Sequence, residues 1–252
     1  MWSSEVEWSN ESMNHKSRIV AVLGKDAEKD VKATGEADMI ELRLDLLAGD
    51  DPLQTMKAIR KATAKPIIAT ARLKTEGGMF QGSEIERIDL LIRAANYADY
   101  VDLELLADQR DDAIARIKKP VILSYHDFQG MPAELELAGI YQEMKKTKAA
   151  IAKIAVTPQS LQDNLRILQF LLDAELDAGL AADMPLCIIA MGGLGRHLRA
   201  VAPLYGSALT YGFVTQSTAP GQMSLAELCL ARKLLDSDIP LHMGRNAHPR
   251  TQ

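Results

Sequence analysis

Lys153 is the residue whose type and setting first suggest covalent chemistry. It lies inside the apolar run AAIAKIAV at residues 149–156, where a cation is costly to desolvate unless it is paired or used in a reaction. Burial of a lysine lowers its pKa from about 10.4 toward neutrality and exposes the lone pair that attacks a carbonyl carbon to form a Schiff base. Lys153 is therefore a candidate covalent catalyst.

Other residues able to do chemistry lie at or just after the ends of short apolar runs. They are Glu41, Arg43 and Asp45; Arg72 and Glu76; Asp102 and Glu104; Ser124 and His126; Met191 with Gly192 and Gly193; and the segment 217–222, which contains Thr218 and Gln222. Residues two apart on a strand face the same side, so we expect Glu41, Arg43 and Asp45 to share one face, as Asp102 and Glu104 do.

The elements that must position these residues alternate along the chain. Short β-branched or apolar runs are each followed by a longer amphipathic stretch, which predicts parallel strands joined by crossover helices. The predicted strands are 18–24, 39–45, 66–72, 100–105, 120–126, 150–156, 185–191 and 208–213. The predicted helices include 83–96, with a Ser83/Glu86 capping box, 161–174 and 225–235.

Eight strand-and-helix units in 252 residues predict a single (β/α)8 TIM barrel. A doubly wound sheet would have fewer strands and a clear nucleotide-binding loop, and the short glycine cluster at 192–195 lacks the full dinucleotide pattern. We expect a polar N-terminal extension at 1–17, one catalytic barrel domain at 18–240 and a C-terminal tail at 241–252. In a barrel of this type, the C-terminal ends of the strands converge on one mouth, where reaction sites lie.

Composition narrows the class of partner and compartment. The formal net charge of -5 gives no sequence-wide attraction to nucleic acid, and no apolar run approaches the ~18 residues of a membrane span. Cys187 and Cys229 both lie in apolar contexts, which disfavours a disulfide framework. Residues 1–17 lack the continuous apolar core of a signal peptide, so we expect a cytoplasmic protein that binds neither nucleic acid nor membrane.

Each candidate residue also has a structural explanation. A lone strand lysine is more often salt-bridged or directed to the surface than nucleophilic, His126 alone could be a hydrogen-bonded core residue, and Glu41 with Arg43 could form a buried ion pair. One amine, one imidazole, several carboxylates and several guanidiniums at the ends of different strands favour chemistry over structure alone.

Read together, these segments resemble type I 3-dehydroquinate dehydratase, a Schiff-base-forming family of the shikimate pathway. The resemblance runs from residue 18 to about residue 236. Its most specific pieces are 41–45 (ELRLD), 72–78 (RLKTEGG), 101–104 (VDLE), 124–128 (SYHDF), 151–155 (IAKIA), 191–199 (MGGLGRHLR) and 219–222 (APGQ). Any one of them is weakly specific, whereas all seven in this order are strongly so.

The resemblance implies a lyase that removes water from 3-dehydroquinate to give 3-dehydroshikimate, a step in chorismate and aromatic amino-acid biosynthesis. It implies that Lys153 condenses with the C3 ketone and that the iminium acidifies the C2 proton. His126 is then the general acid/base that takes this proton and returns one to the departing C1 hydroxyl. Glu76 matches the carboxylate that orients the histidine and is expected to raise its basicity.

The same resemblance assigns the substrate contacts. Arg199 matches the position that binds the substrate carboxylate, and Gln222 and Thr218 complete that end of the pocket on a loop that closes over substrate. Glu41, Arg43 and Arg72 match residues that hold the ring hydroxyls, and Met191 matches an apolar wall beside the imine. Arg196 is the alternative to Arg199 for the carboxylate, and His197 is expected on a helix surface.

Two positions depart from the family pattern. Threonine stands at 218, where serine is often found, and leucine stands at 198, where serine commonly precedes the arginine. Neither change removes a reacting group. No cofactor and no metal are expected, because the iminium supplies the electron withdrawal, and a homodimer is common among relatives.

Two other functions compete with this one. A lysine-imine aldolase of the same barrel type would need a phosphate site in the loops after the seventh and eighth strands, where this chain has Arg199, Thr218 and Gln222. A non-catalytic barrel that binds a small anion would be expected to have lost Lys153 or His126, and both are present.

Overall fold

The protein is described by a computed structural model that places residues 17–47, 51–177 and 184–235 of the 252. The expected tail at 241–252 lies outside the described residues, as does the expected N-terminal extension up to residue 16. The fold described here is therefore that of the barrel, and the expected domain limits stay predictions.

Eight parallel strands form one curled sheet, and each lies within a segment predicted to be a strand or beyond it by one residue. They are β1 (Arg18–Leu23), β2 (Met39–Arg43), β3 (Ile67–Thr70), β4 (Tyr100–Glu104), β5 (Val121–Asp127), β6 (Ile151–Val156), β7 (Leu186–Ala190) and β8 (Leu209–Phe213). A two-residue strand that was not predicted, β9 (Met223–Ser224), pairs with β8. The order across the sheet is β7-β6-β5-β4-β3-β2-β1-β8-β9.

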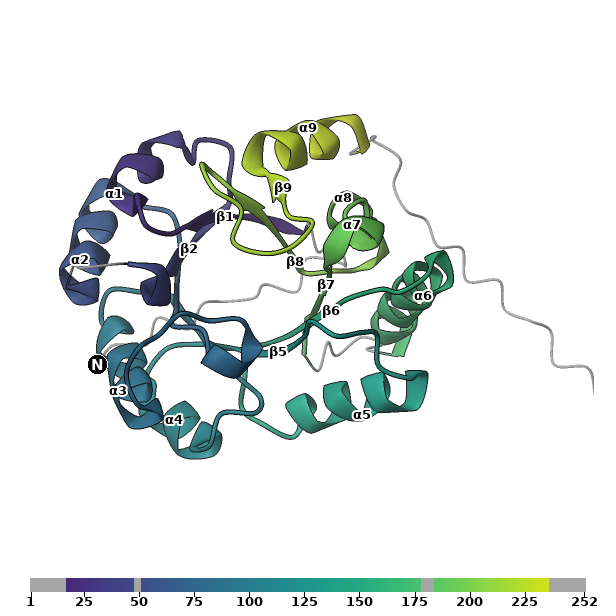
Figure 1. Ribbon diagram of the computed structural model, residues 1–252, viewed down its shortest axis with the longest axis horizontal. Coiled ribbons are helices and arrows are strands. Elements are labelled where there is room, and N and C mark those ends of the chain that lie inside the picture. Colours follow the sequence, from purple (N-terminus) through teal and green to yellow (C-terminus); the bar gives the residue numbers. More distant parts are fainter. Residues whose placement is uncertain (1–16, 48–50, 178–183, 236–252) are drawn as a thin grey trace, which may run out of the picture.

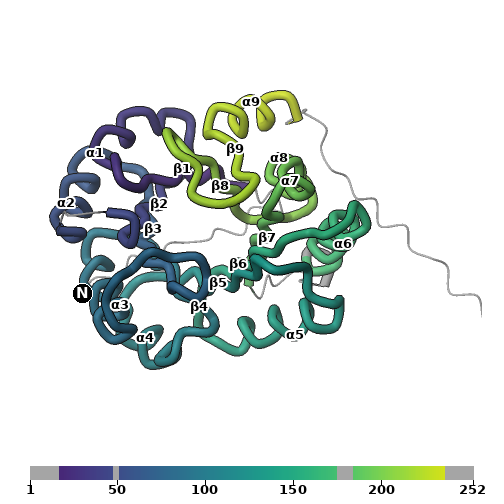
Figure 2. The backbone as a smooth tube through the Cα atoms, in the orientation of Figure 1, coloured from purple at the N-terminus to yellow at the C-terminus, as the bar shows by residue number. Residues whose placement is uncertain are grey.

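The two ends of the curl meet between β7 and β8. The N–H of Ala208 donates to the carbonyl of Leu186 at 2.8 Å, and the N–H of Ile188 donates to Ser207 Oγ at 3.2 Å. With the strands curled into one ring and helices outside it, the chain has the expected barrel architecture (Figures 1 and 2).

The helices lie around the outside of the strands (Figure 2). They are α1 (Ala27–Asp30), α2 (Pro52–Ala62), α3 (Glu84–Ala94), α4 (Arg110–Arg116), α5 (Glu134–Lys145), α6 (Leu161–Asp177), α7 (Gly192–Gly195), α8 (Leu198–Val201) and α9 (Leu225–Leu235), with short 3-10 turns η1 (Val31–Ala33), η2 (Leu44–Leu46), η3 (Lys74–Glu76) and η4 (Ala202–Tyr205). Within the described residues, no helix has the length and apolar character that crossing a bilayer requires. Ser83 caps α3 through the predicted capping box with Glu86, which satisfies amide groups that the first turn leaves free.

Successive residues of each strand point alternately into the barrel and toward the helices, so the apolar side chains form an inner layer and an outer layer. Val20, Met39, Ile68, Ile122 and Ile151 belong to a cluster inside the ring of strands, whereas their chain neighbours pack in two other clusters with residues of the helices. The strand residues two positions further on include Glu41, Ser124 and Lys153, which are polar and buried. The barrel interior is thus apolar toward the start of the strands and charged toward their ends, as period-2 geometry requires.

The second strand is shorter than predicted. It ends at Arg43, and Asp45 lies in the 3-10 turn η2 instead of continuing the strand. The expectation that Asp45 extends the strand face of Glu41 and Arg43 was therefore wrong. The side chain of Asp45 turns back to Arg43 and accepts hydrogen bonds from its Nε and NH2 at 2.8 and 2.7 Å. This ion pair and the N–H of Met79, which also donates to Asp45, stabilise the turn over a longer strand.

Both cysteines are free and buried, so the expectation that they do not form a disulfide framework is confirmed.

Gly221 holds the loop after β8 against the loop after β7. Its φ of 67° lies in the left-handed region, and a Cβ at this position would come within 2.1 Å of the carbonyl oxygen of Gly192. The N–H of Gly192 also donates to the carbonyl of Pro220 at 3.1 Å. This close approach positions the segment that carries Gln222.

We predict that Gly221→Ala lowers the free energy of unfolding by about 1–3 kcal/mol, because alanine is strained at this φ and its methyl group clashes with backbone. Gly193→Ala is the matched control, since it lies in α7 with open space around an added Cβ. Urea unfolding should show a neutral or slightly stabilising effect for this control. Equal effects of the two substitutions would contradict this account of Gly221.

Candidate active site

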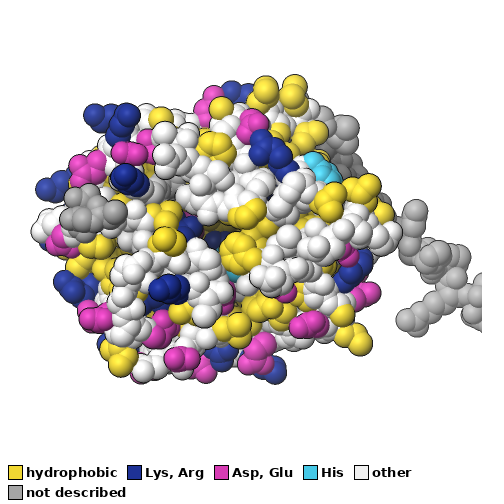
Figure 3. Space-filling view, viewed as in Figure 1, with side chains coloured by type: hydrophobic (Ala, Val, Ile, Leu, Met, Phe, Trp, Pro, Cys, Tyr) yellow, Lys and Arg dark blue, Asp and Glu magenta, His cyan; other side chains and the backbone are white. Residues whose placement is uncertain are grey.

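A cavity of about 530 Å³, open to solvent, lies at the C-terminal ends of the strands. Its walls include every residue that the sequence predicted as catalytic or substrate-binding, namely Glu41, Arg43, Arg72, Glu76, His126, Lys153, Met191, Arg199, Thr218 and Gln222. Figure 3 shows the hollow near the centre of this face, with Lys or Arg atoms inside it and apolar side chains beside it.

Lys153 is buried in this cavity, with 5% of its surface exposed. Its Nζ lies 2.8 Å from Oδ2 of Asp102 and 3.6 Å from Oε1 of Glu41. The alternative that this lysine is salt-bridged is thus correct for the unliganded site, although the amine also faces the cavity. Burial by itself would raise the pKa of Asp102, but the positive charges of Arg72 and Lys153 outweigh it and hold that pKa well below its usual range.

His126 is held by Glu76. The Nδ1 atom of His126 lies 2.8 Å from Oε2 of Glu76, and the backbone N–H of His126 donates to the same oxygen at 3.0 Å. Glu76 comes from η3, after β3, and His126 from β5, so the contact joins two strand ends. The other oxygen of Glu76, Oε1, is buried without a hydrogen-bond partner among the described residues.

Burial and nearby charges set the pKa values of this pair. Burial lowers the pKa of His126 well below its ordinary value, and the positive charges of Arg72 and Lys153 lower it further. Burial and the negative charge of Glu104 raise the pKa of Glu76 to about 8. Burial and nearby cations thus leave the imidazole less basic than a free histidine, and the expectation that Glu76 raises its basicity stays a prediction. The imidazole is neutral near pH 7.

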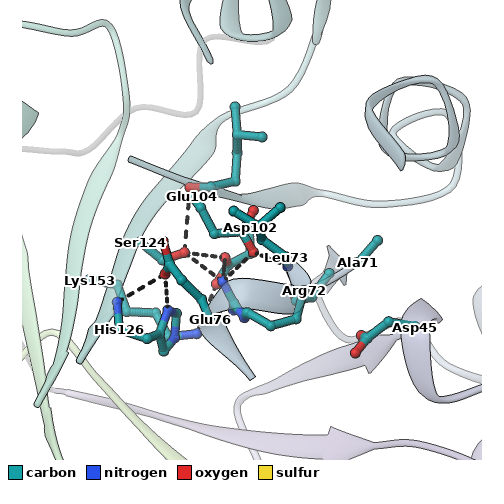
Figure 4. A network of polar contacts seen from close by, with 12 residues as sticks. Asp45, Ala71, Arg72, Leu73, Glu76, Asp102, Glu104, Ser124, His126 and Lys153 are labelled. Carbon is teal, nitrogen blue, oxygen red and sulfur yellow. Dashed lines mark hydrogen bonds and ion pairs between the residues drawn. The ribbon is translucent and has the colours of Figure 1, made fainter. Parts of the chain in front are cut away.

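Arg72 is the centre of the polar network beside the lysine (Figure 4). Its NH1 atom lies 2.8 Å from Oε1 of Glu104 and 2.9 Å from Oδ1 of Asp102, and it donates to Oγ of Ser124 at 2.7 Å. Lys153 and His126 lie at one end of this network. Arg72 thus fixes Asp102, the carboxylate that contacts the amine.

Arg87 extends the network to helix α3. It is 1% exposed, and its NH1 donates to Oε2 of Glu104 and to the carbonyl of Ala71, both at 2.7 Å. Arg87 was not predicted as a site residue, since an arginine within an amphipathic helix has no local pattern that distinguishes a buried residue from a surface one. Its partner Glu104, which was noted among the polar residues at the strand ends, is fully buried.

The alternative that Glu41 and Arg43 form a buried ion pair with each other is wrong. Arg43 pairs with Asp45, while Glu41 accepts a hydrogen bond from Thr70 Oγ1 at 2.9 Å and lies near Lys153. In β2 both side chains face the cavity two residues apart, each with its own partner.

Arg199, on α8, lies in the cavity wall and is 3% exposed. Its NH2 donates to the carbonyl of Pro220 at 3.3 Å, its Nε is buried without a partner, and no described carboxylate forms an ion pair with it. Burial lowers the pKa of Arg199 to about 10. A buried guanidinium without an anionic partner is a binding position for a small anion.

Arg196, the alternative to Arg199 for binding the substrate carboxylate, contacts other groups. Arg196 donates to the backbone carbonyl of Gln222 and pairs with Glu227, both at 2.7 Å, and is not part of the cavity wall. His197 is exposed, as expected.

The loop after β8 forms one rim of the cavity. The Oε1 atom of Gln222 accepts hydrogen bonds from the N–H of Thr218 at 2.8 Å and from its Oγ1 at 3.2 Å. The hydroxyl of the threonine at the position that departs from the family pattern therefore orients the glutamine. Among the described residues, no cluster of histidine, cysteine and carboxylate side chains is arranged to hold a metal ion.

Comparison with known proteins assigns this arrangement to a family. The sequence model of the family described as "Type I 3-dehydroquinase" matches residues 19–238. A 3-dehydroquinate dehydratase of Methanothrix thermoacetophila is 50% identical over 219 residues, covering 86% of this chain and 91% of that protein. One from Methanosarcina barkeri is 42% identical over 239 residues, which covers 89% of this chain and 97% of that protein.

Solved structures agree in fold. The crystal structure of 3-dehydroquinate dehydratase from Geobacillus kaustophilus has a TM-score of 0.79 and 28% identity, and covers 89% of this chain and 93% of that chain. Since the sequence match spans the whole described barrel, including the strand ends that line the cavity, the chain belongs to the type I 3-dehydroquinase family.

Proposed function

We propose that this protein is a hydro-lyase that converts 3-dehydroquinate to 3-dehydroshikimate, a step of the shikimate pathway, through a Schiff base on Lys153. The observation that carries the proposal is the placement of one buried amine and one neutral imidazole in the same small cavity. The amine supplies a nucleophile for the ketone, and the imidazole supplies a base for the neighbouring proton. The family membership supports the reaction class.

The charges of the cavity suggest how the substrate is oriented. Within the part of the chain that the structure describes, Arg199 has no acidic partner and its Nε has no hydrogen-bond partner, so it suits the substrate carboxylate. At the opposite side, Glu41, Arg43 and Arg72 offer fixed donors and acceptors for ring hydroxyls. Gln222 and Thr218 lie on the rim between solvent and substrate, and Met191 gives the imine an apolar wall.

The first chemical step joins Lys153 to the substrate. The ammonium of Lys153 first gives a proton to the neutral imidazole of His126, and the free amine attacks C3. One amine proton then moves to the carbonyl oxygen, the imidazolium returns its proton to the resulting hydroxyl, and this oxygen leaves as water while the C=N bond forms. The product is an iminium, which draws electrons from the adjacent C2–H bond. Asp102, 2.8 Å from Nζ, holds the lysine nitrogen at this position in the resting site.

The second step is the elimination. His126 removes the C2 proton, the electron pair moves toward the iminium, and the enamine then expels the C1 hydroxyl as water with a proton from the same histidine. Water finally hydrolyses the iminium and releases 3-dehydroshikimate and the free lysine. A histidine that is neutral at rest is ready to accept the first proton.

Glu76 orients this histidine. If the imidazole Nδ1–H donates to Oε2 of Glu76, the other nitrogen, Nε2, has its lone pair free for the substrate. The backbone N–H of His126 donates to the same oxygen and fixes the geometry.

The competing functions lack comparable support. An aldolase acting on a sugar phosphate belongs to a different family, and the family match of this chain spans residues 19–238. A non-catalytic binder would not need a buried lysine beside a neutral histidine. A homodimer and a cytoplasmic location, both expected from the sequence, stay predictions.

We predict that borohydride added together with 3-dehydroquinate leaves a reduced substrate adduct on Lys153, because hydride reduces the iminium to a stable secondary amine. Peptide mass spectrometry locates the adduct. Lys153→Ala should show neither the adduct nor turnover, whereas Lys119→Ala, which removes an exposed lysine, should behave like the unaltered protein. A chain that binds the compound without ever becoming labelled would favour the binding-module alternative.

His126→Ala should lower kcat by about 10²–10⁴-fold, because the proton transfer loses its base and acid. Imine formation depends mainly on Lys153, so the imine should accumulate and the fraction trapped by borohydride at steady state should rise. His197→Ala removes an exposed histidine of the same chain and serves as the control. Full activity in His126→Ala would refute the assignment of the general base.

Glu76 should make stability fall with rising pH. Its pKa is raised from 4.5 to about 8 on folding, so the folded state binds the extra proton across this range. The stability contributed by the protonated group is complete below pH ~4.5 and is lost as the pH rises through about 8.

We therefore expect the free energy of unfolding of the unaltered protein to fall relative to Glu76→Gln by at most about 1.4 kcal/mol per pH unit between pH 5.5 and 7.5. Urea unfolding at several pH values measures this difference. Glu136→Gln, at an exposed position, should show no such trend. Parallel pH profiles for Glu76→Gln and the unaltered protein would show that Glu76 is ionised in the folded state throughout this range.

A further inference from the structure

Tyr211 contacts the reacting lysine and has no role in the steps above. It lies in β8 opposite Val20 of β1, is 4% exposed and forms part of the cavity wall. The Nζ atom of Lys153 lies 4.3 Å from the centroid of its ring. An ammonium at this distance over an aromatic face is attracted by the negative face of the ring.

The hydroxyl of Tyr211 takes no part in this contact. It is buried and has no hydrogen-bond partner among the described residues. Burial, with the negative charges of Glu41 and Asp102, raises the pKa of this hydroxyl well above its ordinary value, so the ring stays neutral. A neutral ring keeps its face available to a cation without bringing a competing negative charge.

The other contacts of Nζ must change when an imine forms. An ammonium has three N–H donors, and here it donates to Oδ2 of Asp102 at 2.8 Å, while Oε1 of Glu41 forms an ion pair at 3.6 Å, beyond hydrogen-bond distance. An iminium nitrogen is bonded to the lysine carbon and the substrate carbon and retains one N–H. This N–H can keep at most one hydrogen bond, and the other contacts of the nitrogen are made without a donor.

The aromatic face needs no N–H. It attracts the positive charge itself, whether this charge is on an ammonium or on an iminium. The neutral carbinolamine, which has a C–N single bond and a C–OH bond, gains much less from the same ring. When that C–O bond breaks, the oxygen leaves as water and the nitrogen becomes cationic, so the ring favours the direction of dehydration.

We propose that the ring of Tyr211 stabilises the cationic nitrogen of Lys153 from the resting ammonium through the iminium, and that it thereby favours iminium over carbinolamine. This inference rests on the proposed function, since it requires the Schiff base on Lys153. It makes the ring face, and not the hydroxyl, the functional part of the residue. The carboxylates hold the amine before the reaction, and the ring still contacts the nitrogen after two of its three N–H donors are lost.

The experiment weakens the negative electrostatic potential of the ring face while nearly keeping the shape of the ring. Suppression of a stop codon places phenylalanine, or its mono-, di- or trifluorinated form, at position 211. Each added fluorine makes the ring face less negative. We expect kcat/KM and the fraction trapped by borohydride to fall stepwise, by about three- to thirtyfold from phenylalanine to the trifluorinated ring. A residue with a merely structural role gives no such trend.

Two conventional variants complete the series. Tyr211→Phe keeps the ring face, so its kcat/KM should stay well above that of Tyr211→Leu; it should lose no stability, because the buried hydroxyl has no partner among the described residues. Tyr211→Leu should fall at least as far as the trifluorinated ring. Where the leucine variant does not fold, as circular dichroism will show, the fluorinated series decides by itself.

Three outcomes overturn the inference. If kcat/KM does not change along the fluorinated series while borohydride still labels Lys153 in the unaltered protein, the inference about Tyr211 is wrong and the proposed function is unaffected. A Tyr211→Phe variant as impaired as Tyr211→Leu transfers the role to the hydroxyl. An unaltered protein that borohydride never labels removes the proposed function and this inference together.

Discussion

The site depends on keeping one lysine nitrogen buried without losing its access to the cavity. A buried ammonium is strongly disfavoured unless an opposite charge lies close to it, and Asp102 provides that charge at 2.8 Å. Asp102 is itself held by Arg72, Arg72 by Glu104, and Glu104 by Arg87 on helix α3. Alternating charges therefore run from an outer helix to the amine, and Asp102, Arg72, Glu104 and Arg87 each contact more than one opposite charge.

The same cations set the state of the histidine. Arg72 and Lys153 stabilise Asp102, and at a longer range they disfavour a proton on His126, whose pKa burial has already lowered. The arrangement that keeps the amine buried thus also keeps the imidazole neutral, which a base requires. Arg199 also lines the cavity and has no acidic partner among the described residues, so a bound anion can pair its positive charge.

Much of this arrangement follows from local sequence. The alternation of apolar runs and amphipathic stretches predicted the barrel, and residues at the ends of those runs were correctly expected to converge, since parallel strands of a barrel end at one mouth. The length of β2 was predicted wrongly, and the low pKa of His126 was not predicted. The turn after β2 depends on the N–H of Met79, far along the chain, and the histidine depends on its burial and on Arg72, just after β3, and Lys153 of β6.

The sequence by itself determined the strands, the side of each strand that faces the barrel interior, and the residue types at the cavity. Period-2 alternation is a property of neighbouring residues, so it can be read without knowing the fold. Only the tertiary structure decided which charge pairs with which, that Arg199 and not Arg196 lies at the cavity, and that Tyr211 lies against Lys153. Electrostatic and aromatic contacts act through space between residues far apart in the chain, and burial, which the fold alone sets, determines their strength.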